Sequence, residues 1–208
     1  MLISFDDIVN DYNAEIRGVI HIGAHFGQEY DMYKKHNIKN LMFFEPLVAN
    51  YRELLKNIPK NDNIKTFNIA LGDAVGNKVM FVETANNGQS SSILEPGTHL
   101  DLYPNITFDN REVVKIDRLD NIPFDRTQYN MINIDVQGYE LEVFKGARDT
   151  LSQIDIVYAE INTNEVYKGC PLLSDIDHYL GDMGFSRILT HMACDAWGDA
   201  YYKRTGNG

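Results

Sequence analysis

The sequence predicts an α/β fold built on a doubly wound, mostly parallel seven-stranded sheet, with helices on both faces and an antiparallel C-terminal hairpin at the sheet edge. Short apolar runs alternate with helical patterns along most of the chain. The first run, VIHIGAHFG (19–27), ends in two glycines four residues apart, and the second, LMFFEP, ends in Glu45. Two such strand ends predict a ligand-binding crevice of the Rossmann-like type.

The elements follow from their patterns in chain order. Residues 1–16 are expected to contain a helix, because Ser4 can cap it and one face is apolar. That face comprises Phe5, Ile8, Val9 and Tyr12. Helical segments are expected between five strands, which are predicted at 17–22, 40–45, 64–69, 129–134 and 154–161. A helix near 172–182 and two strands, FSRILTH and DAYYKR, complete the pattern.

The turn after the first strand is suited to hold a ligand. Gly23 and Gly27 allow the backbone to turn sharply and to approach a ligand where any Cβ would collide. The helix that begins at Gln28 offers free N–H groups to an anionic group such as a carboxylate. Glu45 lies 22 positions beyond Gly23, close to the spacing at which an acid reaches a ribose diol. These residues predict a cofactor that contains adenosine.

The loop between the glycines indicates which adenosine cofactor fits. A dinucleotide fingerprint needs two further glycines to accommodate a pyrophosphate, and His25 and Tyr30 occupy those places. S-adenosylmethionine has no phosphate and tolerates this loop better. An NAD-linked oxidoreductase, and a non-catalytic module that retains the cofactor pocket, are the alternatives.

Six motifs occur in the order found in one known family. They are VIHIGAHFGQE, FFEP, NIALGD (68–73), SSSIL (90–94), VVKIDRLD (113–120) and INIDVQGYELEVFKGA (132–147). On these motifs the chain resembles, over roughly 17–204, the FkbM-type methyltransferases of the class I S-adenosylmethionine-dependent group. Two positions depart from that family, because His21 stands where an acid is usual and Gln137 where glutamate is usual.

The resemblance implies S-adenosylmethionine-dependent O-methylation of a hydroxyl on a small molecule or glycan, with a sugar as the preferred acceptor. It also implies a cofactor site formed from these motifs. The predicted cofactor-binding residues are His21, Gly23, Ala24, His25, Gly27, Glu45, Ala70, Leu71, Ser91 and Asp135.

Polar residues at the ends of the later strands are the candidates for catalysis, because ligands of such sheets bind beyond the carboxyl ends of the strands. A hydroxyl must lose its proton, so a general base or a metal is expected. We predict Asp135, Glu160 and His191 as catalytic residues. Asp135, Glu160 and Asn162 could also ligate a hard cation such as Mg²⁺, but the match is one of position only and a metal is not favoured.

Segment 83–110 is polar, contains Pro96 and Pro104, and is predicted to be a loop or lid inserted beside the cofactor site. For the part after Pro96, a disordered surface connection is the alternative. The whole chain, 1–208, is expected to form a single domain. Three further histidines are interpreted as structural: His36, His99 and His178.

Composition limits the partners and the compartment. The net charge of −11 and the scattered lysines and arginines disfavour nucleic acid as a partner. Cys170 and Cys194 are too few for a disulfide framework and lack metal-like spacing, which favours reduced thiols. Neither a signal peptide nor a membrane span is recognisable. We therefore expect a cytoplasmic protein with no membrane partner, while the oligomeric state is not predicted.

Overall fold

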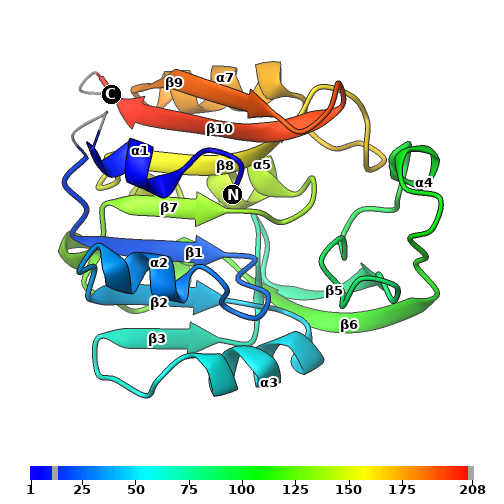
Figure 1. Cartoon of the computed structure of the whole chain (residues 1–208), viewed down its shortest axis with the longest axis horizontal. Coiled ribbons are helices and arrows are strands. Elements are labelled where there is room, and N and C mark those ends of the chain that lie inside the picture. Colours follow the sequence, from blue (N-terminus) through cyan, green and yellow to red (C-terminus); the bar gives the residue numbers. More distant parts are fainter. Residues whose placement is uncertain (11–13, 206–208) are drawn as a thin grey trace.

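The computed structural model describes residues 1–10 and 14–205, and in this part of the chain a seven-stranded sheet forms the centre (Figure 1). Its strand order is β3-β2-β1-β7-β8-β10-β9. β10 is antiparallel to its neighbours β8 and β9, and the other pairs are parallel. The predicted sheet and edge hairpin are confirmed. The strands are β1 (Gly18–Ile22), β2 (Asn40–Phe44), β3 (Ile64–Phe67), β7 (Met131–Ile134), β8 (Ile156–Asn162), β9 (Phe185–Met192) and β10 (Trp197–Arg204).

Helices cover both faces of this sheet because its central strands present apolar side chains on both sides. Ile20 and Ile22 of β1 join the core that packs under one group of helices, whereas Val19 joins the core under the other. The first group is α5 (Glu140–Lys145), α6 (Arg148–Leu151) and α7 (Leu173–Asp182). The second is α1 (Phe5–Asn10), α2 (Tyr30–Lys35) and α3 (Val48–Asn57). Tyr12, predicted on the face of the first helix, lies outside the described residues.

A second sheet occupies the region between the third and fourth predicted strands, where the sequence predicts a helical segment. It consists of β4 (Ala70–Leu71), β6 (Asn110–Asp117) and β5 (Gly76–Val82), in the order β4-β6-β5. Val79 pairs with Val113 on its exposed face, whereas Met80 and Val114 are buried. This alternation with a period of two is that of strands covered on one face. Two short 3-10 helices, η1 (Leu119–Asn121) and η2 (Arg126–Gln128), follow β6.

Between β5 and β6 the chain makes a long excursion, residues 83–109, which contains α4 (His99–Leu102). Its two ends lie side by side because Val82 pairs with Asn110. Figure 1 shows the green α4 on the side of the molecule toward which β1, β2 and β7 point. The excursion therefore faces the carboxyl ends of the main strands, and its role as a lid stays a prediction. None of the helices in the described ranges is long and apolar enough to cross a membrane.

Candidate functional site

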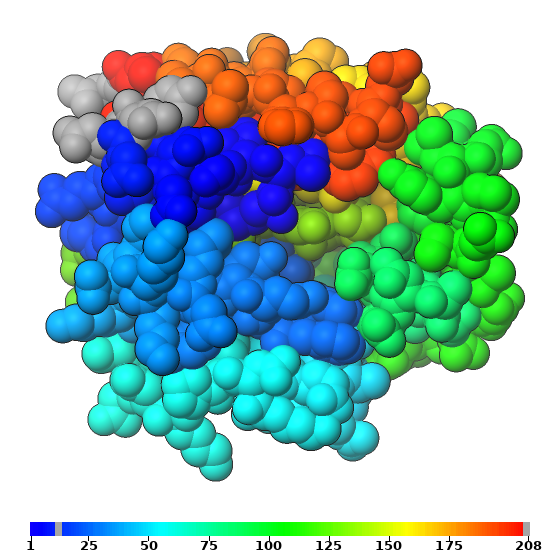
Figure 2. Space-filling view, in the orientation of Figure 1, coloured from blue at the N-terminus to red at the C-terminus, as the bar shows by residue number. Residues whose placement is uncertain are grey.

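A cavity of about 440 Å³ lies between the carboxyl ends of the central strands and the excursion. Figure 2 shows the surface hollowed between the blue N-terminal part and the green part of the chain. Most of the predicted site residues line this cavity, namely His21, Gly23, Ala24, His25, Glu45, Ala70, Leu71, Ser91, Asp135, Glu160 and Asn162. Gly27 and His191 are not among its lining residues.

The first turn is packed so tightly that only glycine fits at its start. Gly23 has a φ of +81°, and a Cβ there would lie 1.8 Å from the carbonyl oxygen of Asp135. The N–H groups of Gly23 and Ala24 donate to the carbonyl oxygen of Phe44 at 3.0 and 2.9 Å. The turn is thereby fixed against the ends of both β2 and β7. Gly27 leaves room for a neighbouring side chain instead, because a Cβ added there would lie 2.9 Å from Ile58 Cδ1.

Glu45 lies directly beside this turn, as its spacing from Gly23 predicts. Its carboxylate accepts hydrogen bonds from the N–H groups of His25 and Leu47, both at 2.9 Å. The side chain is 5% exposed, and burial raises the pKa of Glu45 to about 8 despite these two donors, with Glu112 adding a smaller repulsion. Carboxylate lone pairs beyond those two bonds are available to ligand hydroxyls.

The excursion is attached to the first turn through His25. His25 adopts a φ of +47°, and its Nε2 lies 2.8 Å from the carbonyl oxygen of Asn87. The amide of Gln28 donates to its Nδ1 at 2.8 Å, so Nε2 carries the proton and donates to Asn87. Buried Glu83 orders the same stretch by accepting from the N–H groups of Asn86 and Gly88. Residues 83–91, called the strap below, are thus bonded to the first turn, and several of them line the same cavity as Glu45.

Asp135 and Glu160 are joined by one amide. Gln137 has a φ of +56° and directs its Nε2 to Asp135 Oδ1 at 2.7 Å and to Glu160 Oε1 at 3.1 Å. The hydroxyl of Tyr167 donates to the other end of this amide at 2.5 Å. Desolvation, outweighing the Gln137 bond, raises the pKa of Asp135 to about 6. Burial, followed by the charge of Asp135, raises the pKa of Glu160 well above its usual value.

His21 is a neutral, buried part of the cavity wall. Its Nδ1 accepts from the hydroxyl of Tyr33 at 3.3 Å, and that hydroxyl accepts from the amide of Asn133 at 2.6 Å. Burial lowers the pKa of His21, so the ring is neutral. An acid at this position could carry a negative charge, which His21 cannot.

Two residues that line the cavity are not among the predicted site residues. His99 was interpreted as structural, yet it lines the cavity and is 4% exposed. Trp197, at the start of β10, lines it as well and donates from Nε1 to the hydroxyl of Tyr103 at 2.8 Å. The one sequence signal for His99 and Tyr103 is their place in the long polar segment beside the predicted site.

His191 is not brought to this site. It lies on the edge strand β9, where its side chain is exposed, and it is Asp199 on the neighbouring strand that reaches the cavity. Within the described ranges, no group of three or more histidine, cysteine, aspartate and glutamate side chains is arranged to hold a metal ion. Asp135, Glu160 and Asn162 line the same cavity, but Gln137 places a hydrogen-bond donor between the two acids.

Comparisons with known proteins agree with this fold. The chain resembles a putative S-adenosylmethionine-dependent methyltransferase of Listeria monocytogenes, with a TM-score of 0.55, 8% identity and coverage of 91% of each chain. It also resembles the magnesium protoporphyrin IX methyltransferase of Synechocystis with bound S-adenosylmethionine, with a TM-score of 0.51, 11% identity, and coverage of 90% of this chain and 69% of that one. At these identities the likeness concerns the fold.

Sequence relatives give the family. The 2-O-methyltransferase NoeI of Sinorhizobium fredii is 28% identical over 169 residues, which cover 76% of this chain and 69% of that protein. The methyltransferase FkbM domain matches residues 21–187, a range that contains the first turn, Glu45, Asp135 and Glu160. The chain therefore belongs to the FkbM methyltransferase domain family and is an S-adenosylmethionine-dependent methyltransferase.

Proposed function

We propose that this methyltransferase acts on a hydroxyl of a small molecule or glycan, with a sugar as the preferred acceptor. The observation that carries the proposal is the pair Asp135 and Glu160, joined by one amide on the cavity that Glu45 also lines. A relative named as a 2-O-methyltransferase supports oxygen as the atom that receives the methyl group.

The residues around the first turn fit the cofactor. The carboxylate of Glu45 beside the first turn matches a nucleoside with a free diol, and Gly23 lets that turn pack against the backbone of Asp135. Ala70 and Leu71 offer small apolar surfaces for the adenine, and Ser91 faces the same cavity. When bound, S-adenosylmethionine supplies an electrophilic methyl group.

Asp135 and Glu160 would divide the chemistry of the acceptor. With a pKa of about 6, Asp135 is mostly ionised at neutral pH and can take the hydroxyl proton while the oxygen–methyl bond forms and the sulfur–methyl bond breaks. Glu160, whose pKa is raised well above its usual value by burial and by the charge of Asp135, takes up a proton more readily than an exposed glutamate, and its acid form can donate a hydrogen bond to an acceptor oxygen. Holding the hydroxyl in line with the methyl group would supply much of the rate.

Cofactor binding tests the first part of the proposal. Isothermal titration with S-adenosylmethionine is expected to show binding by the wild type and binding at least about tenfold weaker in Glu45→Ala. Glu53→Ala is the control, because Glu53 lies on the exposed side of α3 and pairs with Lys56. Undiminished binding by Glu45→Ala would contradict the assignment of Glu45.

Methyl transfer tests the second part. We expect mass spectrometry to show the gain of one methyl group by a member of a panel of simple glycosides, and no transfer to tRNA. The net charge of −11 supports this choice over nucleic acid. Transfer to tRNA, or to no glycoside of the panel, would contradict the proposed acceptor class.

A further inference from the structure

We propose that Asn162, His99, Trp197 and Tyr103 form the acceptor subsite of the cavity, and that this subsite takes a neutral ring carrying hydroxyl groups, as in a sugar. The proposal rests on the proposed function and names the part of the cavity, and the chemistry, that would recognise the acceptor. All four residues line the cavity, at the ends of β8 and β10 and in the excursion.

Asn162 is the first observation that points to a ligand. It is 1% exposed, and within the described chain neither its Oδ1 nor its Nδ2 has a hydrogen-bond partner. Buried amide groups are almost always paired, because an unpaired one loses its bonds to water without replacement. Hydroxyl groups of a bound ring can donate to Oδ1 and accept from Nδ2 together. Asn162 is therefore better explained by a ligand than by the fold.

The register of the sheet places this amide beside the catalytic acids. Tyr158, Glu160 and Asn162 alternate along β8 and so share one face. On the antiparallel neighbour β10, Trp197 lies opposite Asn162, and Asp199 lies opposite Glu160. A ring bound by Asn162 therefore lies next to Glu160, which is two residues earlier on the same face of β8.

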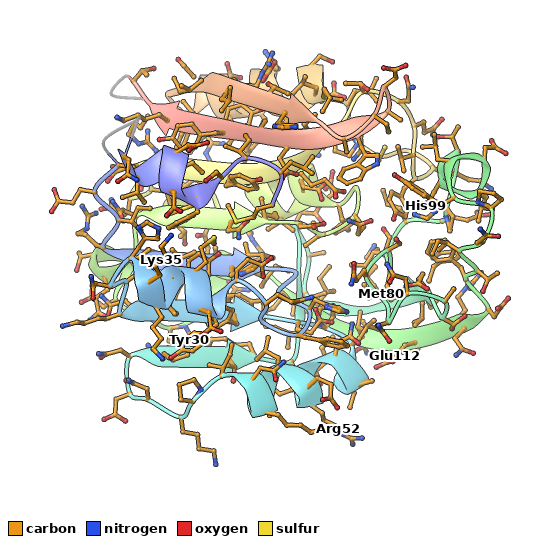
Figure 3. The ribbon with its side chains drawn as sticks, in the orientation of Figure 1. Tyr30, Lys35, Arg52, Met80, His99 and Glu112 are labelled. Atoms are coloured by element: carbon orange, nitrogen blue, oxygen red, sulfur yellow. The ribbon has the colours of Figure 1, made fainter. Side chains whose placement is uncertain are left out.

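His99 supplies a second unpaired group from the opposite wall. Its Nδ1 is buried and has no partner in the described residues, and burial lowers the pKa of the ring. Its position is fixed, because the N–H groups of Gly97 and His99 donate to the carbonyl oxygen of Val166 at 2.9 and 3.1 Å. Figure 3 labels His99, the first residue of α4. Its ring contacts that of Tyr167, with 5.5 Å between centroids.

An aromatic wall completes the subsite. The bond from Trp197 Nε1 to the Tyr103 hydroxyl joins the start of β10 to the excursion at 2.8 Å. Tyr103 keeps 37% of its surface exposed. Flat aromatic rings beside amide and imidazole groups can pack against the C–H face of a sugar while its hydroxyls bond to the polar atoms.

The charges of the cavity select for a neutral acceptor. No lysine or arginine is found among the described residues that line it, whereas Asp135, Glu160 and Asp199 are. A phosphorylated or carboxylated acceptor would meet these acids, and the N-terminal ammonium of Met1 is the one cation among the described lining residues that could balance its charge. The subsite therefore favours an uncharged ring over its phosphorylated form.

The test uses saturation-transfer NMR with the S-adenosylhomocysteine-bound enzyme. The probes are the methyl glycosides of glucose, galactose, mannose and fucose, with glucose 6-phosphate as the charged comparison. We expect the wild type to bind at least one methyl glycoside and to bind glucose 6-phosphate more weakly. Asn162→Leu and His99→Phe are expected to weaken glycoside binding by at least about tenfold, whereas Asn105→Ala and His178→Asn, at exposed positions, leave it unchanged.

Thermal stability separates a binding role from a structural one. Replacing an unpaired buried amide by an apolar side chain of similar size removes a desolvation cost, so Asn162→Leu is expected to keep or raise the melting temperature while glycoside binding is lost. A lower melting temperature with unchanged binding, or no glycoside binding by a wild type that binds S-adenosylhomocysteine, would overturn the subsite. Glycoside binding without methyl transfer would instead refute the proposed O-methylation and leave the subsite standing.

Discussion

At the scale of single residues, the site depends on carboxyl groups whose protonation is set by burial. Glu45, Asp135 and Glu160 all have raised pKa values, and desolvation is the largest cause for each. The charge of Asp135 also raises the pKa of Glu160, so the two acids repel each other less when they are not both ionised. A cofactor that carries a positive sulfonium would favour their ionised forms when it binds.

Asp135→Asn tests the role of the carboxylate beside the methyl group. We expect kcat to fall by about a hundredfold or more, because the amide cannot take a proton. Cofactor affinity is expected to weaken only severalfold, because the charge that favours the sulfonium is lost while Glu45 and the first turn are unchanged. In the wild type, kcat/KM for the cofactor is expected to rise with pH up to about 6 and then level, following the pKa of Asp135 in the free enzyme. Stopped assays across pH 5 to 8 measure this pH dependence. Asp182→Asn is the control, because Asp182 is an exposed residue of α7. An unchanged pH profile in Asp135→Asn would contradict the role.

Glu45→Gln tests how much the buried carboxyl group of Glu45 lowers the stability of the fold when it ionises. The folded pKa of about 8 exceeds the unfolded value near 4.5, so the folded state binds more protons between these limits and stability falls as pH rises through them. Above pH 8, the variant without ligand is therefore expected to melt a few degrees higher than the wild type, while the two converge near pH 5. Differential scanning calorimetry measures both. A variant that melts lower at pH 8.5 would show that the ionised carboxylate stabilises the fold.

Sequence patterns located the site residues that lie at strand ends. Gly23, Glu45, Asp135 and Glu160 follow apolar runs whose ends are fixed by composition, and parallel strands deliver their ends to one edge. His99 could not be located this way. Its place depends on backbone bonds from the excursion to Val166, between segments that have no common periodicity.

At the scale of elements, the first turn and the second sheet illustrate what local patterns can and cannot predict. The turn follows from two glycines and a β-branched strand, and the structure shows a backbone that leaves no room for a Cβ at Gly23. The second sheet pairs 76–82 with 110–117 across the whole excursion. Such a non-local pairing depends on the chain between the strands, so neither strand alone indicates its partner.

Gly23→Ala tests the close approach at the first turn. The added Cβ would lie 1.8 Å from a carbonyl oxygen, and alanine also resists the φ of +81°, so the backbone must move. We expect cofactor binding to weaken by about a hundredfold and the melting temperature to drop by several degrees. Gly169→Ala is the matched control, because Gly169 has a φ of +72° but open space around its Cβ position. Equal effects in the two variants would mean that backbone conformation, and not contact, matters at Gly23.

At the scale of the whole molecule, two parts of the excursion cover the cavity on the side opposite the strand ends. Residues 83–91 are attached to the first turn through His25, and residues 95–99 are attached to the segment after β8 through backbone bonds and the Glu95–Lys168 ion pair. The cofactor side and the acceptor side are thereby covered by the same excursion. Movement of this segment would open both.

His25→Ala tests whether the strap 83–91 controls access to the cofactor. Loss of the bond to the Asn87 carbonyl is expected to raise hydrogen exchange at 86–91 and to speed cofactor release severalfold, while exchange in β1 and β7 stays unchanged. Hydrogen-exchange mass spectrometry and stopped-flow displacement measure these two effects. His36→Ala, outside the cavity, is the control. Unchanged exchange at 86–91 would show that other bonds, such as those that Glu83 accepts, fix the strap without His25.

The pairing of Val82 with Asn110 makes the excursion a self-contained insert, since the chain leaves and rejoins the second sheet at adjacent points. Its length can therefore differ between homologous enzymes without disturbing either strand. Grafting an alternative insert between these anchors, with residues 83–91 retained, offers a route to enzymes with altered acceptor preference.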